Sequence, residues 1–269
     1  MDSKVTIIKE KIQSRDPRLK RHVYHDSRSK NFAFNTAGII VQSIIHNRHI
    51  PILDQGQIGS CTGNAGIGAL ATDPLFSISP KSSKYTLNES GAIHLYSDAE
   101  MIDGDGPFPP NDNGSCGLSI AKALQAAGII SSYQHTFTLD DALKALTQYP
   151  ILVGIKWYEG MMNPDHDGRV HIRGQLAGGH EIVARQIDAP NKRVWFDNSW
   201  GTSWGVNGRF YLTFDDFGAL LSDQGDVTVL IPNGITIPTT TTTTIATPVL
   251  NDDATLAVAM KAWLKAKGL

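Results

Sequence analysis

The feature that most constrains the fold is a change of sequence pattern near residue 148. Before it, apolar residues recur at helical spacing in four segments: residues 60–72, 87–100, 117–127 and 139–146. After it come short runs rich in β-branched and aromatic residues, separated by Gly, Asn and Asp: residues 150–158, 178–188, 192–200, 208–214 and 226–231. A helical half followed by a half of antiparallel strands predicts an α+β protein, with a helical lobe at about residues 50–147 and a β lobe at about 148–232.

The bulk properties are those of an ordinary globular domain. The chain has 269 residues, 41% of them hydrophobic and 19% charged, which is enough to bury a substantial core. A formal net charge of −2 leaves no basic footprint, so we do not expect a nucleic-acid partner. Residues 1–22 lack the apolar stretch of a secretory signal, and residues 37–45 are too short to span a bilayer and read as a strand or buried element. We therefore expect no membrane partner and a cytoplasmic location by default, with export by another route or association with a virion left open.

The two ends of the chain differ from its centre. Residues 1–35 are polar with a basic stretch, and we interpret them as an N-terminal arm or surface strap, or as a short pro-segment. Residues 233–249 form a Thr/Pro-rich linker. Residues 250–269 have the spacing of one amphipathic helix, which either folds back onto the body or docks on a protein partner.

Only two cysteines occur, so at most one disulfide can form and free thiols are expected. Cys61 closes the stretch "QGQIGSC", where a glycine-containing loop enters a predicted helix. At a helix N-terminus the macrodipole and free N–H groups favour a thiolate. Cys61 is therefore a candidate nucleophile; taken alone, it fits a small buried residue at least as well.

A histidine and an amide follow in the β half. His180 lies in "AGGHEIV", where Gly179 and its neighbour permit a close approach, and Asn198 follows the next strand-like run. A hairpin between these runs brings Asn198 beside His180, where an amide oxygen can hold one ring nitrogen and direct the other toward sulfur. These residue types together predict a thiolate–imidazolium site.

The sequence resembles the papain-like cysteine peptidases over residues 52–230. The segments that carry the resemblance occur in the same order: "QGQIGSC", "GGHEIVARQID" and "NSWGTSWGVNGRFYL". A lone G-S-C is a weak signal, whereas the long Asn-Ser-Trp-Gly motif is a strong one. Cys61 and His180 lie 119 positions apart, somewhat fewer than the ~130–150 of the family signature, which indicates trimmed loops.

The resemblance implies a fold and a set of roles. The fold is a two-lobe domain, here residues 36–232, with a helical lobe, an antiparallel β-barrel lobe and the active cleft between them. Cys61 is implied to be the nucleophile, His180 the general base and then acid, and Asn198 the residue that orients the imidazole. Gln55 and the backbone N–H of Cys61 are implied to bind the oxyanion.

Further positions are implied to border the substrate. Trp200 covers the His–Asn pair from water, Trp204 lines the leaving-group side, and the backbone of Gly114, Ser115 and Gly179 flanks the peptide. No cofactor and no metal are needed for this chemistry, and the partner is a peptide or protein substrate.

The sequence departs from the family pattern at several places. Thr62 follows the nucleophile where the family commonly has an aromatic residue, and Glu181 follows the histidine where a small apolar residue is usual. A Glu181 side chain that points into a strand pair is harmless, but one that reaches the cleft stabilises the imidazolium and changes the pH profile. The family's disulfides are absent, and the upstream region is too short for its long helical propeptide.

Three other features have plainer explanations. Cys116 lacks comparable neighbours in the sequence and reads as a packed thiol. Residues 101–114 do not keep the register of a calcium loop, and prolines interrupt them. His166 and His171 with their neighbouring aspartates are explained by a turn at Asp167–Gly168, without a metal.

The sequence therefore predicts a cysteine endopeptidase that passes through a thioester acyl-enzyme. Two alternatives keep the same chemistry: a transpeptidase or ligase, and an amidase acting on cell-wall peptides. A third, of another class, is a catalytically silent peptide-binding or structural module on the same fold.

Overall fold

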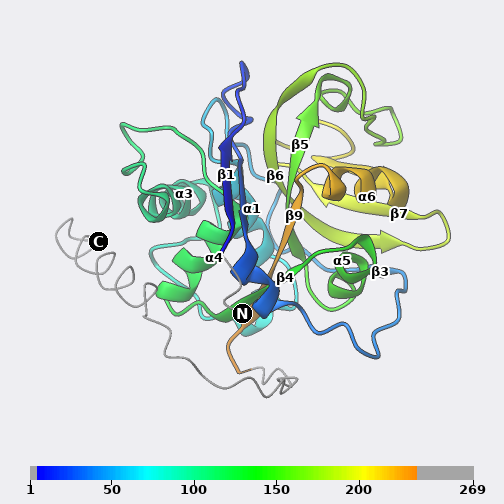
Figure 1. The fold of residues 1–269 in the computed structure, drawn as a ribbon, viewed down its shortest axis with the longest axis horizontal. Helices are drawn as coiled ribbons and strands as arrows, with labels where there is room; N and C mark the ends of the chain where they lie inside the picture. The colour runs from blue at the N-terminus through cyan, green and yellow to red at the C-terminus, as the bar shows by residue number, and fades with distance from the viewer. Residues whose placement is uncertain (1–4, 235–269) are drawn as a thin grey trace.

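The computed structural model describes residues 5–234. The predicted helix at 250–269 and all of the predicted linker after residue 234 lie outside the described residues. The centre of the molecule is a seven-stranded antiparallel sheet in the order β4-β9-β5-β6-β7-β8, with β3 paired to β6 (Figure 1). Its strands are β3 (Ile44–Ile45), β4 (Ile130–Thr136), β5 (Ile151–Tyr158), β6 (Leu176–Asp188), β7 (Arg193–Asp197), β8 (Arg209–Thr213) and β9 (Asp226–Pro232).

Six α-helices flank this sheet in the described part of the chain. They are α1 (Cys61–Leu70), α2 (Leu75–Ile78), α3 (Glu89–Asp103), α4 (Gly117–Ala126), α5 (Leu139–Leu146) and α6 (Phe214–Ser222). Side-chain caps mark the starts of α3 and α5: Asn88 Oδ1 accepts from the N–H of Gly91 at 3.1 Å, and Thr138 Oγ1 accepts from that of Asp141 at 3.1 Å. The four predicted helices are therefore all present, and α5 has the predicted bounds.

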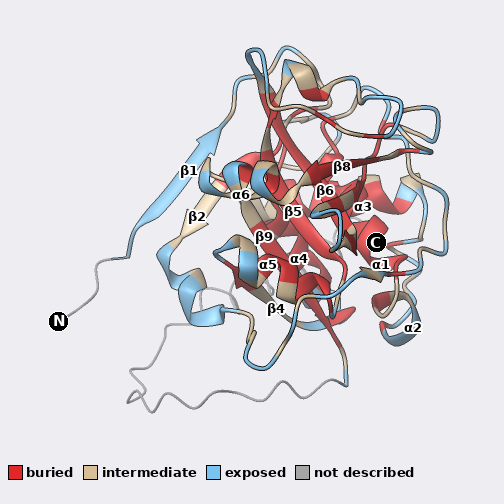
Figure 2. Cartoon of the chain, turned by 90° about the vertical axis from the view of Figure 1, so that its right-hand side faces the viewer, coloured by how far each residue is buried: buried red, intermediate tan, exposed pale blue. Residues whose placement is uncertain are grey.

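The core has two parts because side chains on a strand alternate between the two faces of the sheet. On one face Leu152, Val183 and Leu230 pack with buried residues of α1, α3 and α4. On the other face Val153 and Phe196 pack with buried residues of α5 and α6. Figure 2 shows this buried interior in red on both sides of β5 and β6. The sheet is thus covered on both faces, and the predicted combination of helices with antiparallel strands is observed.

The predicted closed β-barrel is not confirmed. Strands β4 and β8 stand at opposite ends of the strand order and are not paired with each other, so the sheet is open. The β8 strand leads directly into α6, whose Phe217 packs edge-on against Phe196 of β7 at 5.3 Å between ring centroids. Helix α6 therefore covers the sheet face that closure into a barrel would otherwise have enclosed.

Other elements also differ from the sequence prediction. Strand β4 lies in the predicted helical half but pairs with β9, and helices α2 and α6 were not predicted. Of residues 37–45, only Ile44 and Ile45 pair with β6, while Ile40 is 81% exposed. The prediction of a strand or buried element there is therefore wrong for most of the segment.

The N-terminal segment forms a hairpin of β1 (Ile7–Lys11) and β2 (His22–Asp26), followed by the 3-10 helix η1 (Ser27–Phe32). Figures 1 and 2 show β1 running outward along the front of the molecule, with its residues exposed. Lys9 donates to the backbone oxygen of Asp103 at 2.9 Å, and Lys11 pairs with Asp105 at 2.8 Å. Residues 16–22, the second half of the connection between the two strands with the first residue of β2, are named the strap below because they cross between the helices and the sheet.

Candidate active site

Cys61 is the first residue of α1 and is fully buried. The helix packs closely at its glycines: a Cβ atom on Gly66 would lie 2.7 Å from side-chain carbons of both Ile120 and Leu95. Such close approach explains the glycine-rich composition of this helix. It also fixes the position of Cys61 against the sheet, because α1 cannot shift without clashing with α3 and α4.

His180 on β6 and Asn198 after β7 are brought together by the predicted hairpin, in which Val183 lies opposite Asp197. His180 Nε2 lies 2.7 Å from Asn198 Oδ1, and the same oxygen accepts from the backbone N–H of Ser199 at 2.8 Å. Because Oδ1 is an acceptor for both, the proton of the neutral ring is on Nε2. Nδ1 is left without a hydrogen-bond partner among residues 5–234 and has its lone pair available to receive a proton.

Aromatic rings enclose the imidazole. Trp200 lies over His180 at 5.0 Å between centroids with 33° between the planes, and Trp157 meets its edge at 4.9 Å. Trp204 packs edge-on against Trp200 at 5.1 Å and donates from Nε1 to the backbone oxygen of Met162 at 2.8 Å. Trp200 is thus placed to exclude water from the His–Asn pair, and Trp204 supports Trp200.

Gln55 is held in one orientation by Ser199. The Ser199 hydroxyl donates to Gln55 Oε1 at 2.6 Å, so the amide nitrogen faces the other way. That nitrogen donates to the backbone oxygens of Ile58 at 2.6 Å and of Arg18 at 3.2 Å. The sequence reasoning named Gln55 but missed Ser199, although its place directly after Asn198 in the motif was a usable signal.

The strap lies on the three predicted substrate-flanking positions. The N–H of Arg21 donates to the oxygen of Gly179 at 3.0 Å, and the N–H of Gly179 donates to the oxygen of Leu19 at 3.4 Å. On the helical side, the N–H of His22 donates to the oxygen of Ser115 at 2.7 Å. Gly114 has φ +85°, and a Cβ atom there would clash with the oxygen of Lys20. The strap therefore occupies the place expected for a peptide.

Burial under the strap favours the neutral forms of both candidate catalytic groups. Burial raises the pKa of the Cys61 thiol to about 12, and this outweighs the opposing hydrogen bonds from the backbone of Glu181, Lys20 and Thr62. Burial also lowers the pKa of His180 to about 4, against the opposing effect of its bond to Asn198. The expectation that the helix N-terminus favours a thiolate is therefore not met with the strap in place, because desolvation has the larger effect.

Glu181 does not contact the imidazole by a hydrogen bond in the described residues. Its side chain is fully buried, and its nearest cation is Arg21 of the strap, with 4.0 Å between Oε2 and Nε. Burial raises the pKa of Glu181 well above its ordinary value. Its role is thus tied to the strap.

The remaining candidates have structural explanations. Cys116 is buried with its sulfur 3.4 Å from the hydroxyl of Ser119, and both cysteines are free thiols. The oxygen of Asp165 accepts from the N–H of Gly168 in a turn, and Asp165 pairs with His171 at 2.8 Å. Within residues 5–234, no group of three His, Cys, Asp or Glu side chains could hold a metal ion.

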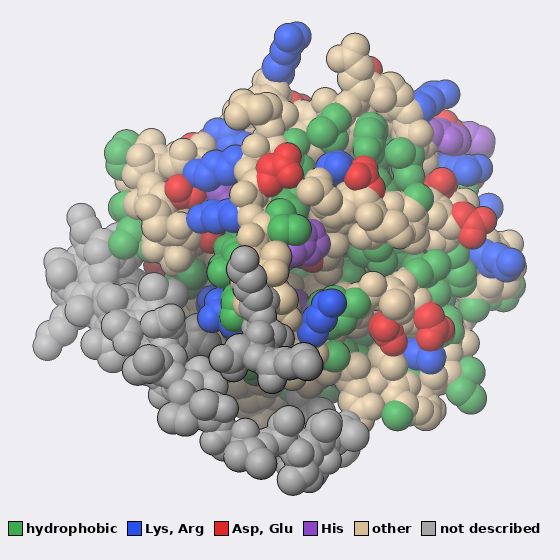
Figure 3. Space-filling view, in the orientation of Figure 1, with side chains coloured by type: hydrophobic (Ala, Val, Ile, Leu, Met, Phe, Trp, Pro, Cys, Tyr) green, Lys and Arg blue, Asp and Glu red, His purple; other side chains and the backbone are tan. Residues whose placement is uncertain are grey.

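The surface and the helices place no strong constraint on partners. Figure 3 shows acidic and basic side chains interspersed over one face of the molecule. None of the helices in residues 5–234 has the length and hydropathy needed to cross a membrane.

The fold is that of the papain-like cysteine proteases. The chain is similar to xylellain, a cysteine protease from Xylella fastidiosa, with a TM-score of 0.60 and 17% identity over 84% of this chain and 99% of that one. It is also similar to digestive procathepsin L 3 of Tenebrio molitor larval midgut, with a TM-score of 0.51 and 14% identity over 75% of this chain and 74% of that one. The ragweed pollen allergen Amb a 11, a cysteine protease solved in its proform, gives a TM-score of 0.54 and 15% identity over 74% of this chain and 69% of that one.

A curated protein also matches in sequence. It is an uncharacterized peptidase C1-like protein of Acanthamoeba polyphaga mimivirus, 26% identical over 204 residues. The match covers 60% of this chain, and the chain spans 64% of the length of that protein. No family model matches the sequence.

Proposed function

We propose that this chain is a cysteine peptidase that hydrolyses peptide bonds and that its strap keeps it latent. Cys61 is the nucleophile, His180 the general base and acid, and Asn198 the residue that holds the imidazole. The Gln55 amide and the backbone N–H of Cys61 stabilise the oxyanion.

The reaction starts once the strap has left. Nδ1 of His180 takes the proton of the Cys61 thiol, and the thiolate attacks the peptide carbonyl to give a tetrahedral oxyanion. Collapse of this intermediate breaks the C–N bond as His180 protonates the departing amine. Water, deprotonated by His180, then attacks the thioester and releases the acid and the free thiol.

The single observation that carries this proposal is the hydrogen bond from Gln55 Nε2 to the backbone oxygen of Arg18 at 3.2 Å. A peptide carbonyl of the strap thus lies at the donor that the proposal assigns to the oxyanion. Ser199 fixes that donor through its 2.6 Å bond to Oε1. An oriented amide that already binds a carbonyl is the arrangement that acyl transfer requires.

Latency follows from the same contacts. The strap is hydrogen-bonded to Gly179 on one side and to Ser115 on the other, and its own residues Leu19 and Arg21 are fully buried. A peptide substrate cannot reach Cys61 while these contacts persist. This supports the pro-segment interpretation of residues 1–35 over that of a loosely attached surface arm.

The test is hydrolysis of a fluorogenic peptide library by the full chain and by its Cys61→Ala variant, with intact-mass analysis of both. We expect slow turnover by the wild type that rises on mild proteolysis, and none by the variant. Added amine nucleophiles distinguish a hydrolase from a transpeptidase, because a transpeptidase would give amide products. A folded wild type whose Cys61 reacts with no peptide probe after strap cleavage would instead indicate a silent binding module.

A further inference from the structure

The sheet builds an acidic pocket at Gly154, on the central strand β5. Gly154 lies directly opposite Glu181 on β6 and directly opposite Asp226 on β9. Directly opposed residues on neighbouring antiparallel strands project to the same face. Two carboxylates therefore flank a position that has no side chain of its own.

The pocket has space because Gly154 and Gly117 carry no side chains. A Cβ atom on Gly154 would lie 2.8 Å from Glu181 Oε2 and would also clash with Nε of Arg21. On the facing helix α4, a Cβ atom on Gly117 would lie 2.6 Å from Glu181 Oε1. Any larger residue at Gly154 or Gly117 would fill the pocket or displace its carboxylate.

Arg21 of the strap occupies this pocket and is fully buried in it. Its Nη2 donates to Asp226 Oδ2 and, at 3.1 Å, to the backbone oxygen of Gln224. Glu181 Oε2 lies 4.0 Å from Nε, at ion-pair distance. Arg21 Nε and Nη1 have no hydrogen-bond partner in the described residues, and Glu181 accepts no hydrogen bond from Arg21. Arg21 thus supplies charge to the pocket without satisfying all of its acceptors.

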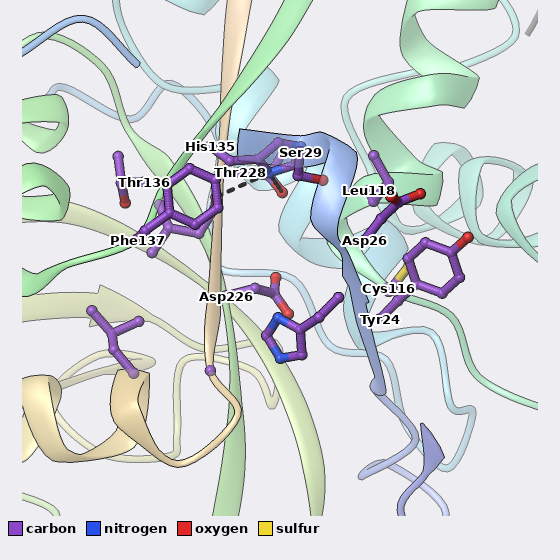
Figure 4. A pocket seen from close by; sticks show the side chains of 14 residues that line it. Tyr24, Asp26, Ser29, Cys116, Leu118, His135, Thr136, Phe137, Asp226 and Thr228 are labelled. Atoms are coloured by element: carbon purple, nitrogen blue, oxygen red, sulfur yellow. Dashed lines mark hydrogen bonds between the residues drawn. The ribbon is translucent and has the colours of Figure 1, made fainter. Parts of the chain in front are cut away.

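The pocket adjoins the proposed catalytic residues. Glu181 directly follows His180, and its backbone contributes a hydrogen bond to the thiol of Cys61. On the opposite side, Asp226 also lines a cavity of about 210 Å³ together with Cys116, Tyr24 and His135 (Figure 4). Through this opening the Asp226 side chain keeps 17% exposure, whereas that of Glu181 has none. The pocket is thus a built recess beside the reacting sulfur.

We propose that this pocket selects substrates by binding an arginine side chain, and that Arg21 imitates that arginine while the strap is bound. The proposal rests on the proposed peptidase function. Arg21 follows Arg18, whose carbonyl contacts Gln55, by three residues, so the substrate arginine lies within three residues of the scissile bond. Arginine suits the pocket better than lysine because its planar group presents five donors to acceptors on three sides.

The experiment uses the full chain with Arg21→Ala, which empties the pocket. Peptide probes carry arginine at one of three positions on either side of the cysteine-reactive group and alanine elsewhere: vinyl sulfones serve for the positions before it, and epoxysuccinyl peptides for the positions after it. A matched set carries citrulline, which has a similar shape but no charge. The rate of adduct formation on Cys61 is followed by intact mass. Arg15→Ala, at an exposed arginine just before the strap, is the control variant.

At one position, we expect arginine to react about tenfold to a hundredfold faster than citrulline, the range of a charge-assisted hydrogen bond. Adding Asp226→Asn to Arg21→Ala should reduce that ratio to about threefold or less, with each peptide rate divided by the iodoacetamide rate of the same chain. The Arg15→Ala chain should remain as slow as the wild type.

Two results would overturn the inference, and they are distinguishable. Rapid labelling of Cys61 with equal rates for arginine, citrulline and alanine would refute the arginine pocket and leave the peptidase proposal standing. Failure of every peptide probe on a folded chain that still reacts with iodoacetamide would refute the peptidase proposal and the pocket with it. If Arg21→Ala does not fold, Arg21→Gln, which retains an amide donor for Asp226, is subjected to the same comparison.

Discussion

The reactivity of Cys61 is the property that the strap controls most directly. With a pKa of about 12, about one thiol in 10,000 is ionised at pH 8, compared with about one in four for an ordinary cysteine of pKa ≈ 8.5. The thiolate is the nucleophile in alkylation. We therefore expect Cys61 in the intact chain to react with iodoacetamide at least about 1,000-fold more slowly than a peptide thiol at pH 8.

Leu19→Ala should open the strap more often and so increase the reactivity of Cys61. Leu19 is fully buried in the core on the α5 and α6 side of the sheet, and its backbone oxygen accepts from Gly179. Replacing a buried leucine by alanine lowers the stability by about 2–5 kcal/mol. Here the loss mainly destabilises the state in which the strap is bound. At about 1.4 kcal/mol per factor of ten, even the lower value raises the population of the open strap about 30-fold.

The assay is a time course of iodoacetamide labelling at pH 8, with both cysteines read separately by peptide mapping. Cys116 is a second reporter of the strap, because it is the N-cap residue of α4 and directly follows Ser115, whose oxygen accepts from the N–H of His22 of the strap. Ile8→Ala is the control substitution, since Ile8 is an apolar residue of the same N-terminal segment with 48% exposure. We expect Cys61 to react at least about 30-fold faster in Leu19→Ala and at the wild-type rate in Ile8→Ala.

Two outcomes would refute the reasoning. A wild-type Cys61 that labels as fast as a peptide thiol would mean that the strap does not cover it in solution. Equal acceleration of Cys61 in Ile8→Ala and in Leu19→Ala would mean that the effect does not come from the buried contacts of the strap.

Three further predictions concern the site and the fold. In the Leu19→Ala background, Gln55→Ala should lower kcat on a peptide substrate by about 100- to 1,000-fold, the cost of an oxyanion donor, and Ser199→Ala by a smaller factor. In the same assay, His180→Ala should lower kcat by at least about 100-fold through loss of the general base and acid, while urea titration shows a folded chain. Burial raises the pKa of Glu100 to about 7, so the folded state holds this proton more tightly than the unfolded one and its stability falls as pH rises from about 4.5 to 7. Glu100→Gln should therefore reduce the decline in the free energy of unfolding between pH 5 and pH 8, measured by urea titration, by about 1–2 kcal/mol, and an unchanged pH slope would contradict this assignment.

Local signals in the sequence account for what was predicted well. Helix α5 matched because Thr138 caps it, Asp140 and Asp141 lie in its first turn and Lys144 lies near its end. Helix α6 carried a comparable signal, since the hydroxyl of Thr213 accepts from the N–H of Asp216, but it was read as part of a strand-rich region. That signal could have been used.

Strand β4 could not be found in the same way. Its sequence, ISSYQHT, alternates poorly, and it becomes a strand by pairing with β9, in which His135 lies opposite Thr228. The open sheet likewise depends on how α6 packs after β8, which no local pattern encodes. Long-range pairing is therefore the main part of the fold that the sequence pattern left undetermined.

In the candidate site, too, local motifs were readable from the sequence and long-range contacts were not. The motifs brought forward Cys61, His180, Asn198 and Gln55, because the residue types and their order carry the chemistry. The covering of Cys61 by the strap was not readable, since it depends on contacts such as Arg21 with Asp226, 205 positions apart. Glu181 was noticed as a departure, but its partner lay in a segment read as polar and basic.

Gly154 has a consequence for how such a chain can change over generations. If substrate arginine and Arg21 share one recess, any substitution that alters the recess alters selectivity and restraint together. Gly154→Val would exclude the arginine of a substrate and also Arg21 of the strap. The enzyme would then have an altered substrate selectivity and would no longer be inhibited by its strap. Viable descendants would therefore need paired changes, and we expect positions 21, 154, 181 and 226 to vary together among relatives of this chain.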